Sequence, residues 1–222
     1  MKKRELTIKG LIRCAKEFCQ IEHQKYYQEY FGVTDGKAIG TIVEHKFQEY
    51  LTSKYDIELG NSANGLDLPT LNTDIKVTSV RQPQSSCPYQ SSKQKIYGLG
   101  YNLIVFVYQK TDNIFNKKGA LDFVSCSFIQ ADRTADYQTT TGLLSIIKNN
   151  GDEDDIFAFL VDHKIPADEV TLHTMAKQIL QNPPKVGYLT ISNALQWRLQ
   201  YGRVVALEKR IAGITSIITY NK

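Results

Sequence analysis

The run of residues 101–109, Tyr-Asn-Leu-Ile-Val-Phe-Val-Tyr-Gln, constrains the fold of this 222-residue chain more than any other segment. It is almost continuously apolar and rich in β-branched and aromatic side chains, which indicates a strand buried on both of its faces. Strands of this kind lie in the middle of mixed α/β sheets. Two further strands are expected over residues 120–129 and 211–220.

Segments with helical spacing of apolar residues surround these strands. Before them, the spacing predicts helices over about residues 6–30 and 37–54. Between the strands at 120–129 and 211–220, it predicts helices over about residues 140–148, 166–180 and 192–207, the last capped by Ser192 or Asn193. We therefore expect the α/β class, with a mixed central sheet flanked by helices and a mainly helical C-terminal lobe.

Length and composition exclude several classes of protein. With 42% hydrophobic and 23% charged residues, the chain is typical of globular proteins. It lacks a signal-peptide pattern and an apolar run of membrane-spanning length, so we expect a cytoplasmic protein with no membrane partner. The length fits one domain over residues 1–222, with a core over about 36–130 and the helical lobe over 131–222.

The residues that carry chemistry are expected in the stretch 65–80. Alternation from Asp74 to Val80 places Asp74, Lys76 and Thr78 on one face of a strand. Asp67 precedes this strand across a short turn that contains Pro and Asn, so the two stretches can form a hairpin. Two carboxylates and an ammonium would then meet, which is what a divalent metal and an attacked phosphodiester require.

The bare pattern of an acidic residue, any residue and Lys is not specific. It occurs four times in the chain, beginning at Asp35, Glu44, Asp74 and Asp162. Only the pair Asp74 and Lys76 shares a strand face with a second aspartate just upstream. The alternative interpretation is a solvated hairpin with an ordinary surface ion pair.

The motif resembles a known family signature. Asp67, six intervening residues and then Asp74-Ile75-Lys76 resemble the PD-(D/E)xK signature of type II restriction endonucleases, over roughly residues 36–110. The spacing is also similar to that of MutH-like mismatch-repair nicking enzymes. Leu66 stands where the family often has Pro, and Asp74 stands where MutH-like enzymes have Glu, so the subfamily stays open.

The resemblance implies a role for each matching residue. Asp67, Asp74 and the backbone carbonyl of Ile75 would bind Mg²⁺, and Lys76 would orient or activate the attacking water. Oxygen ligands of this kind suit Mg²⁺. Glu44 is expected to add a further carboxylate from the helix before the motif, and the alternative for it is a solvated helix glutamate.

A polar segment follows the motif and is the expected DNA contact. Glutamine can bond adenine through two hydrogen bonds, and arginine and lysine can bind bases or phosphates. Within residues 81–95 we expect contacts from Arg81, Gln82 and Gln84, with Lys93 and Lys95 on phosphates. A flexible solvent loop is the alternative.

Taken with the resemblance, these residues predict a type II restriction endonuclease that makes Mg²⁺-dependent, sequence-specific double-strand cuts in DNA. A palindromic target would be matched by a symmetric homodimer on double-stranded DNA. Two alternatives stay open. One is a nicking or repair endonuclease with the same site, and the other is a non-catalytic DNA-binding regulator that uses its C-terminal helices as a helix-turn-helix.

Overall fold

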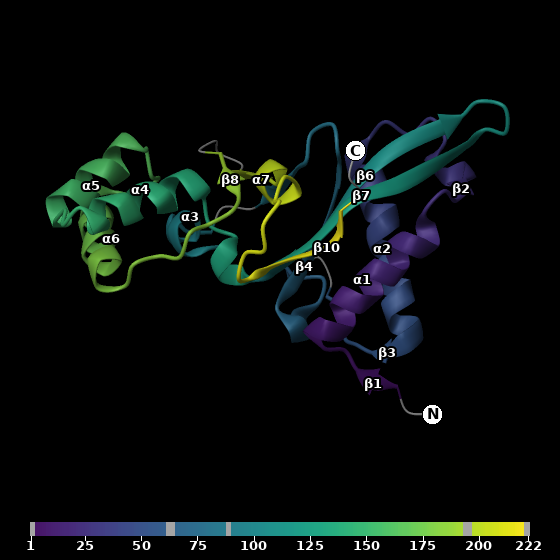
Figure 1. The fold of residues 1–222 in the computed structure, drawn as a ribbon, viewed down its shortest axis with the longest axis horizontal. Coiled ribbons are helices and arrows are strands. Elements are labelled where there is room, and N and C mark those ends of the chain that lie inside the picture. Colours follow the sequence, from purple (N-terminus) through teal and green to yellow (C-terminus); the bar gives the residue numbers. More distant parts are fainter. Residues whose placement is uncertain (1–2, 61–64, 88–89, 193–196, 220–222) are drawn as a thin grey trace. The chain divides into compact units, whose positions relative to one another are not determined.

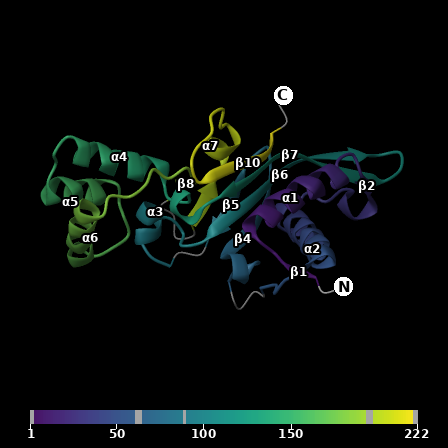
Figure 2. The ribbon, with the colours of Figure 1, turned by 60° about the horizontal axis from the view of Figure 1, so that its bottom comes forward.

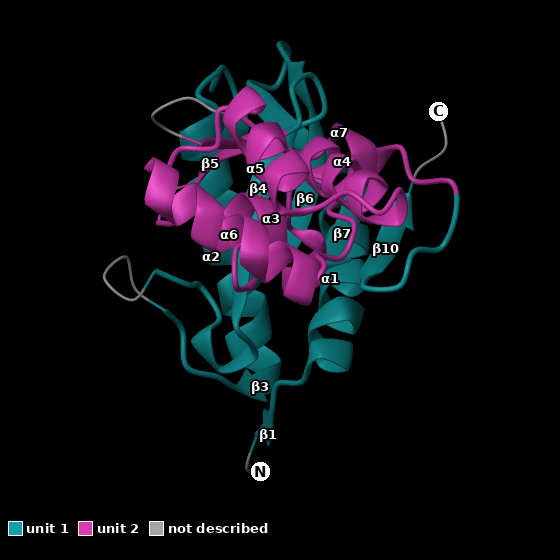
Figure 3. Ribbon diagram, turned by 90° about the vertical axis from the view of Figure 1, so that its left-hand side faces the viewer, with its two compact units in different colours: residues 1–83, 102–129, 209–222 teal, residues 84–101, 130–208 magenta. Residues whose placement is uncertain are grey.

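The computed structural model describes residues 3–60, 65–87, 90–192 and 197–219. The chain divides into two compact units, which Figure 3 colours separately. Unit 1 holds residues 1–83, 102–129 and 209–222, and unit 2 holds residues 84–101 and 130–208. The expected core over 36–130 and lobe over 131–222 do not coincide with these units. The chain leaves unit 1 after residue 83 and again after residue 129, and it returns each time. That both units form one nuclease domain stays a prediction.

Unit 1 is built on a mixed sheet with the strand order β10-β7-β6-β4 (Figure 1). β4 (Thr73–Ser79) runs parallel to β6 (Asn102–Asn113). β6 is antiparallel to β7 (Lys118–Ile129), which in turn pairs antiparallel with β10 (Ile214–Thr219). The short β2 (Tyr26–Tyr27) also pairs with β7. The predicted mixed α/β architecture is thereby confirmed.

The strand predicted over residues 101–109 is the buried centre of this sheet. Residues Leu103 through Tyr108 of β6 are all at most 3% exposed. The strand continues to Asn113, where its last residue pairs with Lys118 across a turn at residues 114–117. The strand is therefore longer than the predicted run, because pairing with β7 carries the hairpin beyond the core.

Two helices cover the sheet of unit 1 and lie side by side in Figures 1 and 2. α1 (Ile8–Glu22) packs on β7 and β10, and α2 (Gly36–Lys54) packs on β4. The helix expected over 6–30 ends early, because Gln24 takes a left-handed conformation (φ 57°) and the next residues pair as β2. Beside the helices, β1 (Arg4–Glu5) runs parallel to β3 (Tyr55–Asp56).

Four phenylalanine rings hold the helices on the sheet. Phe106 of β6 lies 4.9 Å from Phe47 of α2, 5.6 Å from Phe123 of β7 and 6.0 Å from Phe18 of α1, measured between ring centroids. All four side chains are at most 3% exposed. Tilted and edge-on aromatic contacts of this kind add to the free energy gained from burial. The cluster therefore fixes the position of α2 relative to β4 and β6.

Unit 2 combines helices with a small sheet. Its longer helices are α4 (Tyr137–Lys148), α5 (Glu153–Asp162) and α6 (Glu169–Gln181), and its short ones are α3 (Lys93–Tyr97) and α7 (Gly202–Val205). The sheet has the order β5 (Gln84–Cys87), β9 (Trp197–Gln200), β8 (Thr190–Ile191). The helices expected over 140–148 and 166–180 are confirmed. Asp152 caps α5, since its side chain accepts from the backbone N–H of Asp155 at 3.1 Å.

The helix expected over residues 192–207 is wrong. Trp197 and Leu199 are buried while Arg198 and Gln200 between and after them are exposed, which is the alternation of a strand. Pairing of β9 with β5 and β8 determines this outcome. The cap expected at Asn193 lies outside the described residues. Among residues 197–207 the helical part is the four-residue α7, which is too short to serve as the second helix of a helix-turn-helix.

Within the described ranges, no helix is long and apolar enough to cross a bilayer.

Phe47→Ala should lower the free energy of unfolding by about 3–5 kcal/mol, because it removes a buried ring from the aromatic cluster and leaves a cavity. Urea unfolding followed by far-UV circular dichroism measures the change. Phe115→Ala is the matched control. Its ring is fully exposed at the hairpin turn, so we expect a change within about 0.5 kcal/mol. Equal effects of the two substitutions would contradict this description of the core.

Candidate active site

A backbone bridge brings Asp67 and Asp74 together. The N–H of Leu68 donates to the carbonyl of Thr73 at 3.0 Å, and the N–H of Thr73 donates to the carbonyl of Leu68 at 3.2 Å. Asp67 and Asp74 are the next residues outward on the two sides of this bridge. Residues in such positions are cross-strand neighbours with side chains on the same face. The predicted approach of the two aspartates across a turn is thus present.

Asp67 is held by backbone groups on both sides. Its Oδ2 accepts from the N–H of Ile75 at 2.7 Å, and its carbonyl accepts from the N–H of Gly60 at 2.9 Å. The Ile75 side chain itself is buried in the core of unit 1. Ile75 therefore orients the Asp67 carboxylate through its N–H. The metal contact predicted for the Ile75 carbonyl stays a prediction.

Lys76 pairs with Asp74 on the strand face that alternation predicted. Its Nζ lies 2.6 Å from Oδ2 of Asp74. The Lys76 side chain is 23% exposed and that of Asp74 is 8% exposed, so the pair is reachable from solvent on the lysine side only. The ion pair is thus largely buried, unlike the surface pair of the alternative interpretation.

Glu44 reaches the same place from α2. Its carboxyl group hydrogen-bonds to that of Asp67, which in turn shares a hydrogen bond with Asp74. α2 packs against β4, and Val43 and Phe47 on either side of Glu44 are buried, so Glu44 lies at the edge of the helix face that meets the sheet. The structure therefore brings together Glu44, Asp67, Asp74 and Lys76.

The concentration of carboxyl groups changes their ionisation. Burial raises the pKa of Asp74 to about 7, and the hydrogen bond with Asp67 acts in the same direction, while Lys76 opposes it. Burial also raises the pKa of Asp67, as does Glu44, whereas the contacts with Asp74 and the Ile75 N–H lower it. Neutralisation by a proton or by a cation therefore stabilises this cluster.

The carboxyl oxygens are a chemically suitable set for a divalent cation of the Mg²⁺ type. Among the described residues, however, no group of three or more His, Cys, Asp or Glu side chains is already arranged to hold a metal. Lys76 and the Ile75 N–H each contact one of the aspartate oxygens, and the carboxyl groups contact one another. Binding of a cation would therefore replace hydrogen bonds within the cluster.

The residues predicted to contact DNA are divided between the units. Arg81 and Gln82 are exposed in the turn after β4 of unit 1. In unit 2, Gln84 belongs to β5 and pairs with Gln200 of β9, and Lys93 is exposed at the start of α3. The segment is thus more ordered than the solvent loop that was the alternative, although residues 88 and 89 lie outside the described ranges.

Lys95 differs from the other predicted DNA contacts. Its side chain is 5% exposed, and burial lowers its pKa while the nearby carboxylate of Asp136 opposes that shift. The polar sequence around it indicated an exposed position, but α3 packs this side chain inward. A phosphate contact by Lys95 would require it to leave this position.

Comparison with known proteins identifies the family. The family described as type II restriction enzyme NspV matches residues 5–216. The type II restriction enzyme NspV of Nostoc sp. (strain ATCC 29411 / PCC 7524) is 49% identical over 216 residues, which are 97% of this chain and 98% of that protein. The chain belongs to this family. No solved structure matches it.

Membership of the NspV family confirms the prediction of a sequence-specific restriction endonuclease, that is, a site-specific deoxyribonuclease. The alternative of a non-catalytic regulator is set aside. The four clustered residues lie within the part of the chain that matches the family.

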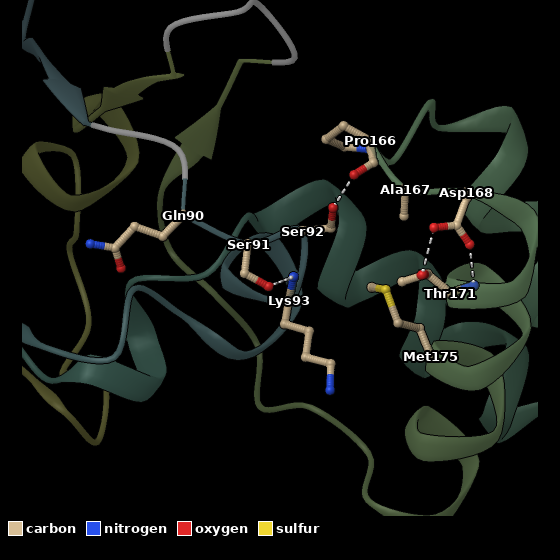
Figure 4. Close-up of a pocket in the computed structure, with 9 residues that line it drawn as sticks. All are labelled: Gln90, Ser91, Ser92, Lys93, Pro166, Ala167, Asp168, Thr171 and Met175. Carbon is tan, nitrogen blue, oxygen red and sulfur yellow. Dashed lines mark hydrogen bonds between the residues drawn. The ribbon is translucent and has the colours of Figure 1, made fainter.

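Unit 2 contains a hollow of about 270 Å³, lined by residues of 90–93 and of 166–175 (Figure 4). Polar side chains that line it already serve local structure. The Asp168 carboxylate accepts from the N–H and the hydroxyl of Thr171 at 2.7 and 3.0 Å, and the Ser92 hydroxyl donates to the carbonyl of Pro166. These contacts give the hollow no catalytic group that is not already used in local structure.

The raised pKa of Asp74 predicts a pH effect on stability in the absence of metal. Its unfolded-state pKa is about 3.9, below the folded value of about 7. The folded state therefore binds this proton more tightly, and stability should fall as pH rises from about 4 to 7. Thermal unfolding in EDTA across this range, for wild type and Asp74→Asn, isolates the contribution. Parallel profiles would contradict it, because Asn cannot titrate.

Proposed function

We propose that this restriction enzyme hydrolyses DNA as a PD-(D/E)xK nuclease whose catalytic site is the cluster of Asp67, Asp74, Lys76 and Glu44. The observation that carries the proposal is the contact between Lys76 and a buried, raised-pKa aspartate that neighbours a second one. An ordinary structural ion pair does not need an additional carboxyl group beside it. Clusters of this kind are characteristic of sites that bind metals or move protons.

Asp67 and Asp74 would hold Mg²⁺, with the carbonyl of Ile75 as the further ligand that the family resemblance implies. Bound there, Mg²⁺ would supply charge neutralisation at the phosphodiester and ease deprotonation of a water. The fit rests on the carboxylates themselves. They are partly buried and mutually repelling, and one of them keeps a proton up to about pH 7 in the metal-free protein. A divalent cation would displace that proton and relieve the repulsion.

Lys76 would act on the reacting groups through its ammonium. Its Nζ is anchored to Asp74 and partly open to solvent, so a water and a phosphate oxygen can both approach it. From that position it would orient the water for in-line attack on phosphorus and donate a hydrogen bond to the charge that develops on the phosphoryl oxygens. The leaving group is the 3′ oxygen, so the products would carry a 3′ hydroxyl and a 5′ phosphate.

Glu44 would complete the site from the helix side. Its hydrogen bond to Asp67 supports a role in setting the ionisation and orientation of that ligand.

The DNA contacts are proposed from the chemistry of the side chains that follow the motif. Arg81, Gln82 and Gln84 would contact bases or phosphates, and Lys93 would contact a phosphate. Lys95 has the weakest support of this group because it is buried.

Lys76→Ala should slow cleavage by about 10²–10³-fold, because the developing charge loses a donor, while DNA binding and folding are retained. Digestion of unmodified DNA of mixed sequence, with Mg²⁺ and with EDTA, measures cutting, and a gel-shift assay in EDTA measures binding. Discrete fragments are expected from wild type with Mg²⁺ only.

Lys110→Ala is the matched control for this substitution. Lys110 also pairs with an aspartate two residues away on a strand of unit 1, at Asp112, but no further carboxyl group joins that pair in the described interactions. Cleavage by Lys110→Ala should equal that of wild type. Equal cleavage by Lys76→Ala and wild type would refute the proposed site.

We also propose that the enzyme acts on double-stranded DNA as a symmetric homodimer, with one strand cut by each subunit. A supercoiled plasmid with one target site should then pass to the linear form, and sedimentation should give twice the mass of the 25.2 kDa chain. Accumulation of open-circular DNA as the end product, with a monomeric protein, would favour the nicking or repair alternative instead.

A further inference from the structure

The turn between the two candidate metal ligands adopts a conformation that needs support. It consists of a short 3₁₀ segment, η2 (Pro69–Leu71), followed by Asn72 in the left-handed region (φ 46°, ψ 48°). Asparagine adopts this region more readily than most residues other than glycine, and contacts from the surrounding structure hold the turn in this one shape. The length and shape of this turn determine how the bridge residues Leu68 and Thr73 face each other.

Asn102, the first residue of β6, supplies those contacts. Its side-chain Nδ2 donates to the carbonyl of Leu71 at 3.1 Å and lies 3.5 Å from the hydroxyl oxygen of Thr73. Its backbone N–H donates to the carbonyl of Asn72 at 2.8 Å. The Thr73 hydroxyl donates to the same Leu71 carbonyl at 2.8 Å. Two side chains thus converge on one carbonyl inside the turn.

These contacts lead directly to the carboxylates. Thr73 is fully buried and is followed by Asp74, while its bridge partner Leu68 is preceded by Asp67. The residue after Asn102, Leu103, pairs in register with Asp74. One end of β6 therefore supports both the turn that separates the ligands and the strand that carries the second one.

We propose that the Asn102 side chain is a positioning residue for the pair Asp67 and Asp74, and that it sets the affinity of the site for a divalent cation. The inference rests on the proposed function, since it takes these aspartates as metal ligands. Asn102 touches neither of them, so its effect passes through Leu71, Thr73 and the bridge. Groups that hydrogen-bond metal ligands directly contribute about 10–100-fold in metal affinity or activity. Because Asn102 acts through the turn, we expect an effect at the lower end of that range.

Binding of Mn²⁺ alone to the DNA-free protein, followed by electron paramagnetic resonance of the free ion, tests this proposal without relying on activity. Asn102→Ala should weaken Mn²⁺ binding by about 10-fold. In parallel, the Mn²⁺ concentration for half-maximal DNA cleavage should rise by a similar factor, and cleavage should recover at saturating Mn²⁺.

Asn113→Ala is the matched control. Asn113 is the last residue of the same strand and also fixes a turn, since its Oδ1 accepts from the N–H groups of Phe115 and Asn116 at 3.0 and 3.3 Å. Its removal should leave Mn²⁺ binding unchanged. Equal weakening by Asn113→Ala would mean that general loss of stability, rather than the motif turn, controls the affinity, and would overturn the proposal.

Two further variants keep the outcome decisive. Thr73→Val removes the other donor to the Leu71 carbonyl and should weaken Mn²⁺ binding in the same direction, even where Asn102→Ala fails to fold. Asp74→Asn should abolish it. If Asp74→Asn loses Mn²⁺ binding while folded Asn102→Ala and Thr73→Val bind Mn²⁺ as wild type does, the metal site stands and the positioning role of Asn102 is overturned. Wild-type binding in Asp74→Asn would overturn the metal site and this inference with it.

Discussion

The repulsion between two carboxyl groups in a partly buried place is the constraint on which the rest of unit 1 depends. Left to solvent, Asp67 and Asp74 would separate. The bridge between Leu68 and Thr73 and the hydrogen bond from the Ile75 N–H keep them together. Burial is the largest cause of the raised pKa values of both groups, and for Asp74 the hydrogen bond with Asp67 acts in the same direction. Because burial disfavours the charged carboxylates, a cation that binds between them stabilises the site. A metal-dependent nuclease needs this behaviour.

The buried sheet makes that arrangement rigid. β4 carries Asp74 and Lys76 beside the buried segment Leu103–Tyr108 of β6, so the backbone under the site has little freedom to relax. On α2, Glu44 is three residues before Phe47, whose ring packs against Phe18 and Phe106. Core packing thereby determines where a polar side chain stands. The stability of the fold and the geometry of the site share the same residues.

Much of this could be predicted from sequence where the pattern is local. The unbroken apolar run of β6 and the alternation in β4 were sufficient to find the central strand and the shared face of Asp74 and Lys76. The turn before β4 was sufficient to place Asp67 beside Asp74. Glu44 needed the family resemblance as well, because spacing alone does not say that a helix and a turn meet. The resemblance named Glu44, and the packing of α2 on β4 brings it to Asp67.

Non-local pairing explains what could not be predicted. The apolar residues Trp197, Leu199, Val204 and Leu207 were predicted to lie on one helix. Pairing of residues 197–200 with β5, more than a hundred residues away, decides in favour of a strand there. The inward position of Lys95 likewise depends on how α3 packs in unit 2. The support that Asn102 gives to the motif turn leaves no sequence signal beyond a polar residue at the start of an apolar strand.

The return of the chain to unit 1 after unit 2 has a consequence for the newly made protein. β10, at residues 214–219, pairs with β7 and is synthesised after everything else in the sheet. Until those residues have left the ribosome, β7 has an open edge and α1 lacks one of the strands on which it packs. The sheet that carries the proposed cutting site is therefore complete only once residues 214–219 have been synthesised, so a chain that stops before them lacks one strand of this sheet.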